Sequence, residues 1–353
     1  MKLLTVALPG REYDIVIESG VLAEAGPRIR ALLPKAGKAA LVTDSHVAPL
    51  YAGAVADSLS AAGFEVALFT VPAGESSKCV SRLEQLWEGF LEFGLTRSDA
   101  VVALGGGVVG DLTGFAAATV LRGVPFIQIP TTLLAQVDSS VGGKVAIDLK
   151  AGKNLAGTFY QPSLVLMDPS LLGSLPDKTF ADGMAEVIKY GCIADGEFLR
   201  FLKANPSREQ IMAHIEQVLY TCCAIKRDIV MEDERDTGRR MILNFGHTLG
   251  HAYELAGGYE AYTHGQAVAA GMVRAAELGV GLGITPPYLA SLIRELTASF
   301  GLPTSIPCTG EEYAAAIGLD KKGSGDRIAL ILADQPGHAL AYQMKKSELL
   351  QLL

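Results

Sequence analysis

The sequence predicts two domains: an α/β domain built on a parallel β-sheet, followed by a mostly α-helical domain. The chain has 353 residues, enough for two hydrophobic cores of ordinary size. In the first half, short apolar runs alternate with amphipathic helical segments, whereas helical periodicity dominates after about residue 176. We place the boundary at the LPD stretch (175–177), which gives domains of residues 1–176 and 177–353.

Four apolar runs in the first half are predicted to be strands: KAALVTD (38–44), FEVALFTV (64–71), AVVALGGG (100–107) and PFIQIPTT (125–132). Helical patterns at about 46–62 and 76–93 lie between the first three. Strands separated by helices indicate a parallel sheet with right-handed crossovers. Ligands gather at the carboxyl ends of such strands. Three of these runs end in polar or glycine-rich turns, at Asp44, GESSK and GGGVVGD.

Four segments of the second half have helical periodicity: ADGMAEVIKYG, EQIMAHIEQVLYTCCAIKRDIVMED, LNFGHTLGHAYE and HGQAVAAGMVRAAELGVGLG. We see no internal repeat and no low-complexity linker between the halves. A cleft between the two domains is the expected place for a ligand.

Composition and charge narrow the class of protein. Hydrophobic residues make up 49% and charged residues 19%, with 39 glycines, which is typical of a globular protein rich in tight turns. The net charge of −8 disfavours a nucleic-acid or anionic-membrane partner. The five cysteines lack CxxC spacing and are expected to be free thiols. Neither a signal peptide nor an uninterrupted membrane span is apparent, so we expect a soluble cytoplasmic protein.

The GGGVVGD turn, Gly105 to Asp111, follows a strand and opens a helix. Its bare N–H groups could receive a pyrophosphate, although the GxGxxG spacing is missing. A glycine turn needed only for close packing is the alternative. In GESSK, Glu75 and Lys78 could bind ribose hydroxyls, but a solvated turn is the simpler interpretation of these residues alone.

The segment 130–162 holds many polar groups between glycines and hydroxyl residues. They include Asp138, Lys144, Lys153 and Asn154, beside a predicted sheet edge. One loop lysine is usually just solvated, whereas two lysines next to glycine turns favour anion binding.

His247 and His251 are four residues apart, so they share a helix face on which one metal could touch both. Two histidines packed at a helix interface are about equally expected. Zinc proteases carry a general-base Glu directly after the first His of such a pair; here the residue is Thr248, which argues against a peptidase. Arg240 is about two turns earlier and would line the same face if the helix began that early.

Glu186 lies in an otherwise apolar helical segment, with Lys189 one turn later. A surface Glu–Lys pair is the simpler interpretation of these two residues alone. His264 stands at a probable helix start. Glu186, His247 and His264, with His251 beside them, could provide one carboxylate and two imidazoles, a zinc set with an open coordination position.

Together these motifs resemble the 3-dehydroquinate synthase family of sugar phosphate cyclases. The similarity extends from about Asp44 to DKK (320–322), with the motifs in the family's order. Two stretches, QVDSSVGGK (136–144) and FGHTLGHAYE (245–254), are highly specific for the family. The others are GESSK, GGGVVGD, LRG, KNLAGTFYQP, GMAEVIKYG and HGQAVAAGM.

The resemblance implies a Rossmann-like N-terminal domain that binds NAD and a helical C-terminal domain that binds a divalent metal, usually zinc, with cobalt possible. By position the metal ligands would be Glu186, His247 and His264. The NAD contacts would be Asp44, Glu75, Lys78, Gly105, Gly106, Gly107, Val108, Val109, Gly110, Asp111, Thr131, Thr132, Lys144, Lys153 and Ser174. The substrate would be surrounded by Asp138, Lys144, Asn154, Lys189, Lys226, Arg240, Asn244, His251 and one of Lys321 or Lys322. Arg122 would reach the neighbouring subunit's site, which implies a homodimer.

The implied reaction converts a sugar phosphate, 3-deoxy-D-arabino-heptulosonate 7-phosphate, to 3-dehydroquinate and phosphate. It proceeds by transient oxidation with NAD, phosphate elimination, reduction and intramolecular aldol closure. Lys226 and Arg240 suit the substrate carboxylate, and Lys144 and Arg122 its phosphate. His251 is then a substrate or proton-relay residue rather than a ligand.

Four positions depart from the common family residues: Val145, Asp148, Ser174 and Gln266, in place of Thr, Asn, Thr and Glu. They bear on rate and substrate fit more than on reaction class. Three alternatives remain: a sister cyclase that makes an inosose or valiolone, a metal-dependent polyol dehydrogenase, and an inactive NAD-binding scaffold.

Overall fold

The computed structural model describes residues 1–236, 238–319 and 325–353. The chain divides into two compact units, one of Met1–Leu175 with Lys226–Met231 and one of Pro176–Ile225 with Glu232–Leu353. The first junction lies at the LPD stretch. The segment Lys226–Met231 belongs to the first unit although it comes late in the chain. The predicted division at one boundary, into residues 1–176 and 177–353, does not include this return of the chain.

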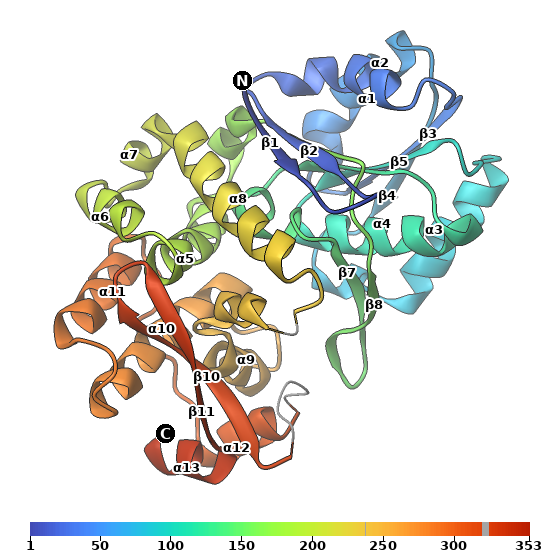
Figure 1. Cartoon of the computed structure of the whole chain (residues 1–353). Helices are drawn as coiled ribbons and strands as arrows, with labels where there is room; N and C mark the ends of the chain where they lie inside the picture. Colours follow the sequence, from blue (N-terminus) through green and yellow to red (C-terminus); the bar gives the residue numbers. More distant parts are fainter. Residues whose placement is uncertain (237, 320–324) are drawn as a thin grey trace. The chain divides into compact units, whose positions relative to one another are not determined.

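The first unit is built on a seven-stranded sheet of order β1-β2-β9-β6-β5-β3-β4 (Figure 1). The strands are β1 (Lys2–Val6), β2 (Tyr13–Ile17), β3 (Lys38–Asp44), β4 (Glu65–Val71), β5 (Ala100–Gly105), β6 (Phe126–Pro130) and β9 (Leu164–Met167). All neighbours pair in parallel except β1 and β2. A short turn joins those two strands, and such a turn permits only antiparallel pairing, so the sheet is mixed but mainly parallel.

The four predicted strands, β3 to β6, are confirmed, and so are the predicted helical segments between the first three. A π-helical turn (Ala48–Ala52) leads into α2 (Gly53–Ala61), and α3 (Val80–Glu92) follows β4. Helices α1 (Ala25–Leu32) and α2 pack on one face of the sheet, and α3 and α4 (Gly107–Thr119) on the other (Figure 1). Successive strand residues point to opposite faces, so both faces of the central strands are apolar.

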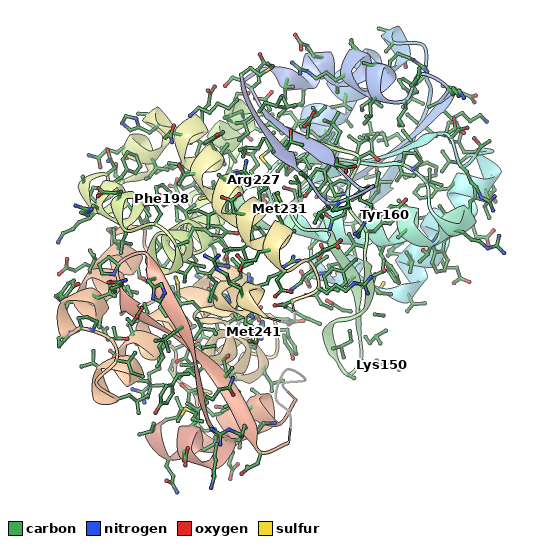
Figure 2. All side chains as sticks on the ribbon, viewed as in Figure 1. Lys150, Tyr160, Phe198, Arg227, Met231 and Met241 are labelled. Atoms are coloured by element: carbon green, nitrogen blue, oxygen red, sulfur yellow. The ribbon has the colours of Figure 1, made fainter. Side chains whose placement is uncertain are left out.

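Short turns and one hairpin complete the first unit. The turns are η1 (Val21–Glu24), η3 (Glu75–Ser77), η4 (Val120–Arg122), η5 (Ala135–Ser139) and η6 (Pro169–Ser174). Strands β7 (Lys144–Leu149) and β8 (Gly152–Phe159) form the hairpin, with Lys150 at its tip (Figure 2). The hairpin packs against α4, where Gly114 leaves room for Val145: a Cβ at position 114 would lie 2.4 Å from Val145 Cγ1.

The second unit is mostly helical, as expected. It also contains one pair of strands that the sequence did not predict. Its helices are α5 (Asp177–Ile193), α6 (Gly196–Ala204), α7 (Arg208–Ala213), α8 (Ile215–Glu232), α9 (His247–Ala256), α10 (His264–Gly281), α11 (Pro287–Ser299), α12 (Gly310–Leu319) and α13 (Lys346–Leu352), α8 being shared with the first unit. Strands β10 (Arg327–Gln335) and β11 (His338–Lys345) form an antiparallel hairpin.

The long helix predicted over 209–233 is two helices, α7 and α8, separated at His214. No proline or glycine there breaks the pattern. The His214 ring instead packs edge-on against Phe201, with ring centroids 5.5 Å apart. Tertiary packing therefore sets the break, which local periodicity did not predict.

All five cysteines lie among the described residues and are free, which confirms the expectation from their spacing. Among the described residues, no helix is both long enough and apolar enough to span a membrane.

Asp99 ties together the segments that lead into the central strands β3 and β5. Its Oδ1 accepts from the backbone N–H groups of Gly37 and Lys38, each at 2.8 Å, and its Oδ2 from the backbone N–H and hydroxyl of Thr96. Burial opposes ionisation of Asp99, but these hydrogen bonds outweigh it and lower the pKa of the carboxyl. An ionised Asp99 therefore stabilises the folded chain.

Asp99→Asn should lower the free energy of unfolding by about 1–3 kcal/mol at pH 7, because an amide cannot accept on both sides. Since the folded pKa lies below the unfolded value of about 3.9, this stabilisation is present above that pH and is lost as the pH falls through the folded pKa. Urea unfolding at pH 7 and pH 3 measures both effects, with the exposed Asp57→Asn on α2 as control. An equal difference between wild type and D99N at both pH values would contradict the assignment.

Candidate active site

Three side chains in the second unit form a compact set of potential metal ligands. Glu186 from α5, His247 from α9 and His264 from α10 each offer one ligand atom, and these atoms lie within 4.8 Å of one another. The Nε2 atoms of His247 and His264 are 3.5 and 3.7 Å from Glu186 Oε1. One carboxylate with two imidazoles is a common zinc donor set.

Glycines bring the helices that carry these ligands into close contact. Gly246, at φ +80°, caps α9 directly before His247, and its added Cβ would lie 2.7 Å from Val268 O of α10. A Cβ on Gly271 would lie 2.1 Å from Gly246 O, and one on Gly265 would lie 2.1 Å from Asp182 O of α5. A larger residue at these positions would push the helices apart. The glycines of FGHTLGH and HGQAV are therefore required by helix packing.

Each histidine of the set has a second partner on its other ring nitrogen. His247 Nδ1 is 3.2 Å from the carbonyl oxygen of Phe245. His264 Nδ1 is 3.5 Å from Glu254 Oε1, and Glu254 is 4% exposed. In both rings the nitrogen that faces Glu186 is Nε2.

The two imidazoles differ in protonation. Burial lowers the pKa of His247 to about 3, and the Lys189 ammonium acts in the same direction, so this ring is neutral. Burial also acts to lower the pKa of His264, but Glu186 and Glu254 outweigh it and raise the pKa to about 10. The carboxylates on either side of the His264 ring thus favour a positive charge there.

Glu186 and Lys189 are not a surface pair. Glu186 is 0% and Lys189 1% exposed, and the Lys189 ammonium contacts Glu186 Oε2. The surface interpretation was wrong because α5 is covered: its residues from Gly183 to Ile193 are all buried. A buried carboxylate requires such a positively charged neighbour.

His251 lies one turn after His247 with ring centroids 5.8 Å apart, outside the three-residue set. Asn244, His247 and His251 line one pocket together with Met241 (labelled in Figure 2), Thr248 and three residues of β10. This pocket therefore has a polar side beside His247 and an apolar side formed by Ile328 and Ile331.

Arg240 does not continue the helix of His247. It lies in the 3₁₀ turn η7 (Arg239–Asn244), and the left-handed Gly246 starts α9 only at His247. The Arg240 side chain is 2% exposed and donates to Glu234 O at 2.5 Å, while Asp233 Oδ2 accepts from its backbone N–H at 3.0 Å. The condition for a shared helix face, a helix that begins before Arg240, is therefore not met, and Arg240 remains in the second unit.

In the first unit, the GGGVVGD turn forms the end of β5 and the start of α4. Gly106 is the N-cap of α4 and makes no side-chain capping hydrogen bond. A Cβ on Gly106 would lie 3.1 Å from Thr132 Cγ2, and one on Gly107 3.1 Å from Ser139 Oγ. Close packing accounts for these glycines, and the uncapped first turn also offers N–H groups to an anion such as a pyrophosphate.

Lys78 is the centre of a polar cluster beside α4. It is 4% exposed, so the solvated-turn interpretation was wrong for it. Its ammonium donates to Asp111 Oδ2 at 2.9 Å and to Asn154 Oδ1 at 2.5 Å, and lies 3.5 Å from Glu75. Burial acts to lower the pKa of Lys78, but Asp111 and Glu75 outweigh it and raise the pKa. Lys78 therefore stays charged.

Asp138 on η5 and Lys226 on α8 are brought together by an ion pair of 2.8 Å, and Lys226 also donates to Asp138 O. Lys226 is 6% exposed rather than a surface lysine. The ion pair links residues 88 positions apart, both of which belong to the first unit.

The remaining expected NAD contacts lie on loops or strands of the first unit. Asp44 Oδ1 accepts from the N–H groups of His46 and Val47, so it caps the turn after β3. Ser174 Oγ is 2.6 Å from the Tyr51 hydroxyl. Thr131 and Thr132 follow β6, and Lys144 and Lys153 lie on β7 and β8.

Arg122 lies in an unusual turn after α4. Leu121 and Arg122 have φ values of 50° and 67°, and Gly123 follows at 114°. Arg97 Nε donates to Leu121 O at 2.8 Å, and the Tyr160 hydroxyl (Figure 2) donates to Val124 O at 2.8 Å. Two side chains thus hold this strained backbone in place.

At three of the unusual family positions the residue makes a contact that the common residue would also make. Gln266 completes a capping box with Thr263 at the start of α10, which a Glu would also form. Asp148 Oδ1 accepts from the Asn154 N–H at 2.7 Å, as an Asn oxygen would. Val145 is buried against Gly114, where a similarly shaped Thr would fit. The expected substrate residues Lys321 and Lys322 lie outside the described residues.

Sequence reasoning assigned no role to Glu254, the partner of His264, or to the capping Thr263. The signal for Glu254 was its spacing: it follows His247 by seven residues, about two helical turns, and so shares its face. The carbonyl of Phe245 has no side-chain signal that a sequence could show.

Comparison with known proteins agrees with this geometry. Residues 68–182 match the family model for the 3-dehydroquinate synthase N-terminal region, and residues 183–323 match that for the C-terminal region. The chain is 45% identical over 340 residues to the 3-dehydroquinate synthase of Clostridium beijerinckii, covering 96% of this chain and 97% of the relative. It is 46% identical over 358 residues to that of Desulforamulus reducens, covering 100% and 99%.

Solved structures of sister cyclases share the fold. A 2-deoxy-scyllo-inosose synthase complexed with carbaglucose-6-phosphate, NAD+ and Co2+ has a TM-score of 0.89 at 26% identity, covering 99% of both chains. The 2-epi-5-epi-valiolone synthase of Streptomyces hygroscopicus, with NAD+ and Zn2+ bound, has a TM-score of 0.88 at 26% identity and covers 98% of both chains. Since the synthase relatives are much more similar in sequence over nearly the whole length, this chain belongs to the 3-dehydroquinate synthase family.

Proposed function

We propose that the chain converts 3-deoxy-D-arabino-heptulosonate 7-phosphate to 3-dehydroquinate and phosphate, with NAD and a divalent metal, Zn2+ or Co2+, as cofactors. The observation that carries this proposal is the compact set of Glu186, His247 and His264 in a chain of this family. Structures of two sister cyclases contain NAD+ with Co2+ or Zn2+, which supports the same cofactors here.

The second unit has the donors that such a metal requires. Glu186 Oε1 and the two Nε2 atoms would hold the ion, and Lys189 offsets the charge of the buried carboxylate. In the first unit, the uncapped start of α4 would hold the pyrophosphate of NAD. When bound, NAD supplies a reversible hydride acceptor, and the metal a Lewis acid for substrate hydroxyl oxygens.

The chain's cations suit a substrate with a carboxylate and a phosphate. Arg240 and Lys226 would bind the carboxylate, and Lys144 and Arg122 the phosphate. Arg240 and Lys226 are held by protein oxygens, which fixes their position before substrate binds. The other expected substrate contacts are Asp138, Asn154, Lys189, Asn244 and His251.

His251 would exchange a proton with a substrate oxygen. Its ring lines the pocket that also includes His247 and Asn244, so a bound hydroxyl can be reached by an imidazole that does not hold the metal. The two histidines of the FGHTLGH motif would thus have separate roles, ligand and proton relay.

Two further expectations concern assembly and location. We expect a homodimer in which Arg122 reaches the substrate site of the neighbouring subunit. This is supported by the left-handed backbone at Leu121 and Arg122, which Arg97 stabilises by a hydrogen bond to Leu121 O. A cytoplasmic location is supported by the five free cysteines, which is typical of a reducing compartment.

Phosphate release from 3-deoxy-D-arabino-heptulosonate 7-phosphate tests the proposed function. With catalytic NAD the purified chain should release phosphate without accumulating NADH, because the reaction has no net redox change. A chelator should abolish release, and added zinc or cobalt should restore it. No release from this substrate would contradict the synthase, and steady NADH formation from a polyol would indicate a dehydrogenase.

His247→Ala and His251→Ala should separate ligand from proton relay. H247A should no longer retain stoichiometric zinc after dialysis, whereas H251A should retain it and still lose about 10²–10⁴-fold in kcat. Metal analysis and steady-state kinetics on both variants measure this difference. Equal zinc content in the two variants would contradict the separate roles.

A further inference from the structure

We propose that Glu254 is a positioning residue for the metal: its carboxylate holds Nδ1 of His264 so that Nε2 of the same ring faces Glu186. The inference deepens the proposed function and rests on it only in assuming that Glu186, His247 and His264 bind a divalent cation. Glu254 would not touch the ion itself, because it lies on the opposite side of the His264 ring from Glu186.

The geometry joins two helices through one ring. Glu254 lies in the last turns of α9 and is 4% exposed, and its Oε1 is 3.5 Å from Nδ1 of His264, the first residue of α10. The other ring nitrogen is 3.7 Å from Glu186 Oε1 on α5. The imidazole is therefore placed between two buried carboxylates from different helices, and its two nitrogens have distinct partners.

This arrangement determines which nitrogen can bind a metal. An imidazole binds a cation through a nitrogen that carries no hydrogen. When a cation replaces the proton on Nε2, a carboxylate at Nδ1 keeps the second proton on Nδ1 and makes the ring a stronger donor. His247 has the neutral Phe245 carbonyl in the same position, at 3.2 Å. The partners of the two Nδ1 atoms are therefore Phe245 O and Glu254 Oε1. Of these two, Glu254 alone is charged and is a side chain.

Charge balance supports the same role. Lys189 contacts Glu186 and offsets its negative charge, so these two residues together add no net attraction for a cation. Glu254 adds a second buried carboxylate to the group. A carboxylate beside a ligand imidazole favours the bound cation by Coulomb attraction.

The test compares Glu254→Gln with wild type by zinc affinity and by the visible absorption of the cobalt-loaded chain, both without substrate. Gln keeps the size of the side chain but removes its charge. We expect E254Q to bind zinc about 10–100-fold more weakly, to reach wild-type stoichiometry at saturating zinc, and to shift the cobalt bands. A second variant, Glu254→Asp, shortens the side chain and draws the carboxylate away from Nδ1, so it should also weaken zinc binding and takes the place of E254Q if that variant does not fold.

Thr285→Val is the matched control, because Thr285 is also buried in the second unit and its hydroxyl donates to Ala333 O at 2.7 Å. T285V should lower thermal stability without changing zinc affinity. A merely structural role for Glu254 would give E254Q this same behaviour, and zinc affinity within about twofold of wild type would overturn the proposal.

A double-mutant cycle with His264→Ala shows whether Glu254 acts through His264. The loss caused by E254Q should disappear in the H264A background, and an undiminished loss there would also overturn the proposal. Zinc binding is independent of turnover. A chain that behaves as expected here but releases no phosphate would contradict the proposed function alone, whereas an active enzyme with unchanged zinc affinity in E254Q would contradict this inference alone.

Discussion

The contact between α9 and α10 is the constraint on which the metal set depends. His247 and His264 are the first residues of these two helices, and they approach one another only because Gly246, Gly250 and Gly271 bring the backbones together. Gly265 allows the same close approach to α5, which carries Glu186. Because side chains at these positions would separate the helices by more than a metal–ligand set tolerates, the glycines of the two histidine motifs are part of the site.

Pairing of buried charges is the second constraint. Lys78 with Asp111, Lys189 with Glu186, and Lys226 with Asp138 are pairs whose lysine is at most 6% exposed. A buried charge is stable only beside an opposite charge or suitable hydrogen-bond partners. An acidic chain can therefore keep charged lysines in its interior, each beside a carboxylate.

Family membership indicates the reaction class, and local geometry shows how the unusual residues of this chain fit around the site. Identity of about 45% over nearly the whole chain connects it with the synthases, whereas the sister cyclases share the fold at 26% identity. The unusual residues of this chain do not alter that connection, because Gln266 and Asp148 keep the hydrogen bonds that the common Glu and Asn would make. They adjust the surroundings of the site without removing a proposed ligand.

The sequence by itself determined the mainly parallel sheet and the helical second half, because periodicity is a local property. Its resemblance to a known family, and not periodicity, indicated Glu186, His247 and His264 as one set. It did not determine that Lys78, Lys189 and Lys226 are buried, that the helix of His247 begins only after Gly246, or that β10 and β11 form a hairpin. It also left Glu254 without a role. Burial of the lysines depends on contacts between distant segments, such as Lys78 with Asn154 and Lys226 with Asp138, and only the tertiary structure decides such contacts. The start of α9 and the β10–β11 hairpin depend on backbone geometry that helical periodicity does not reveal.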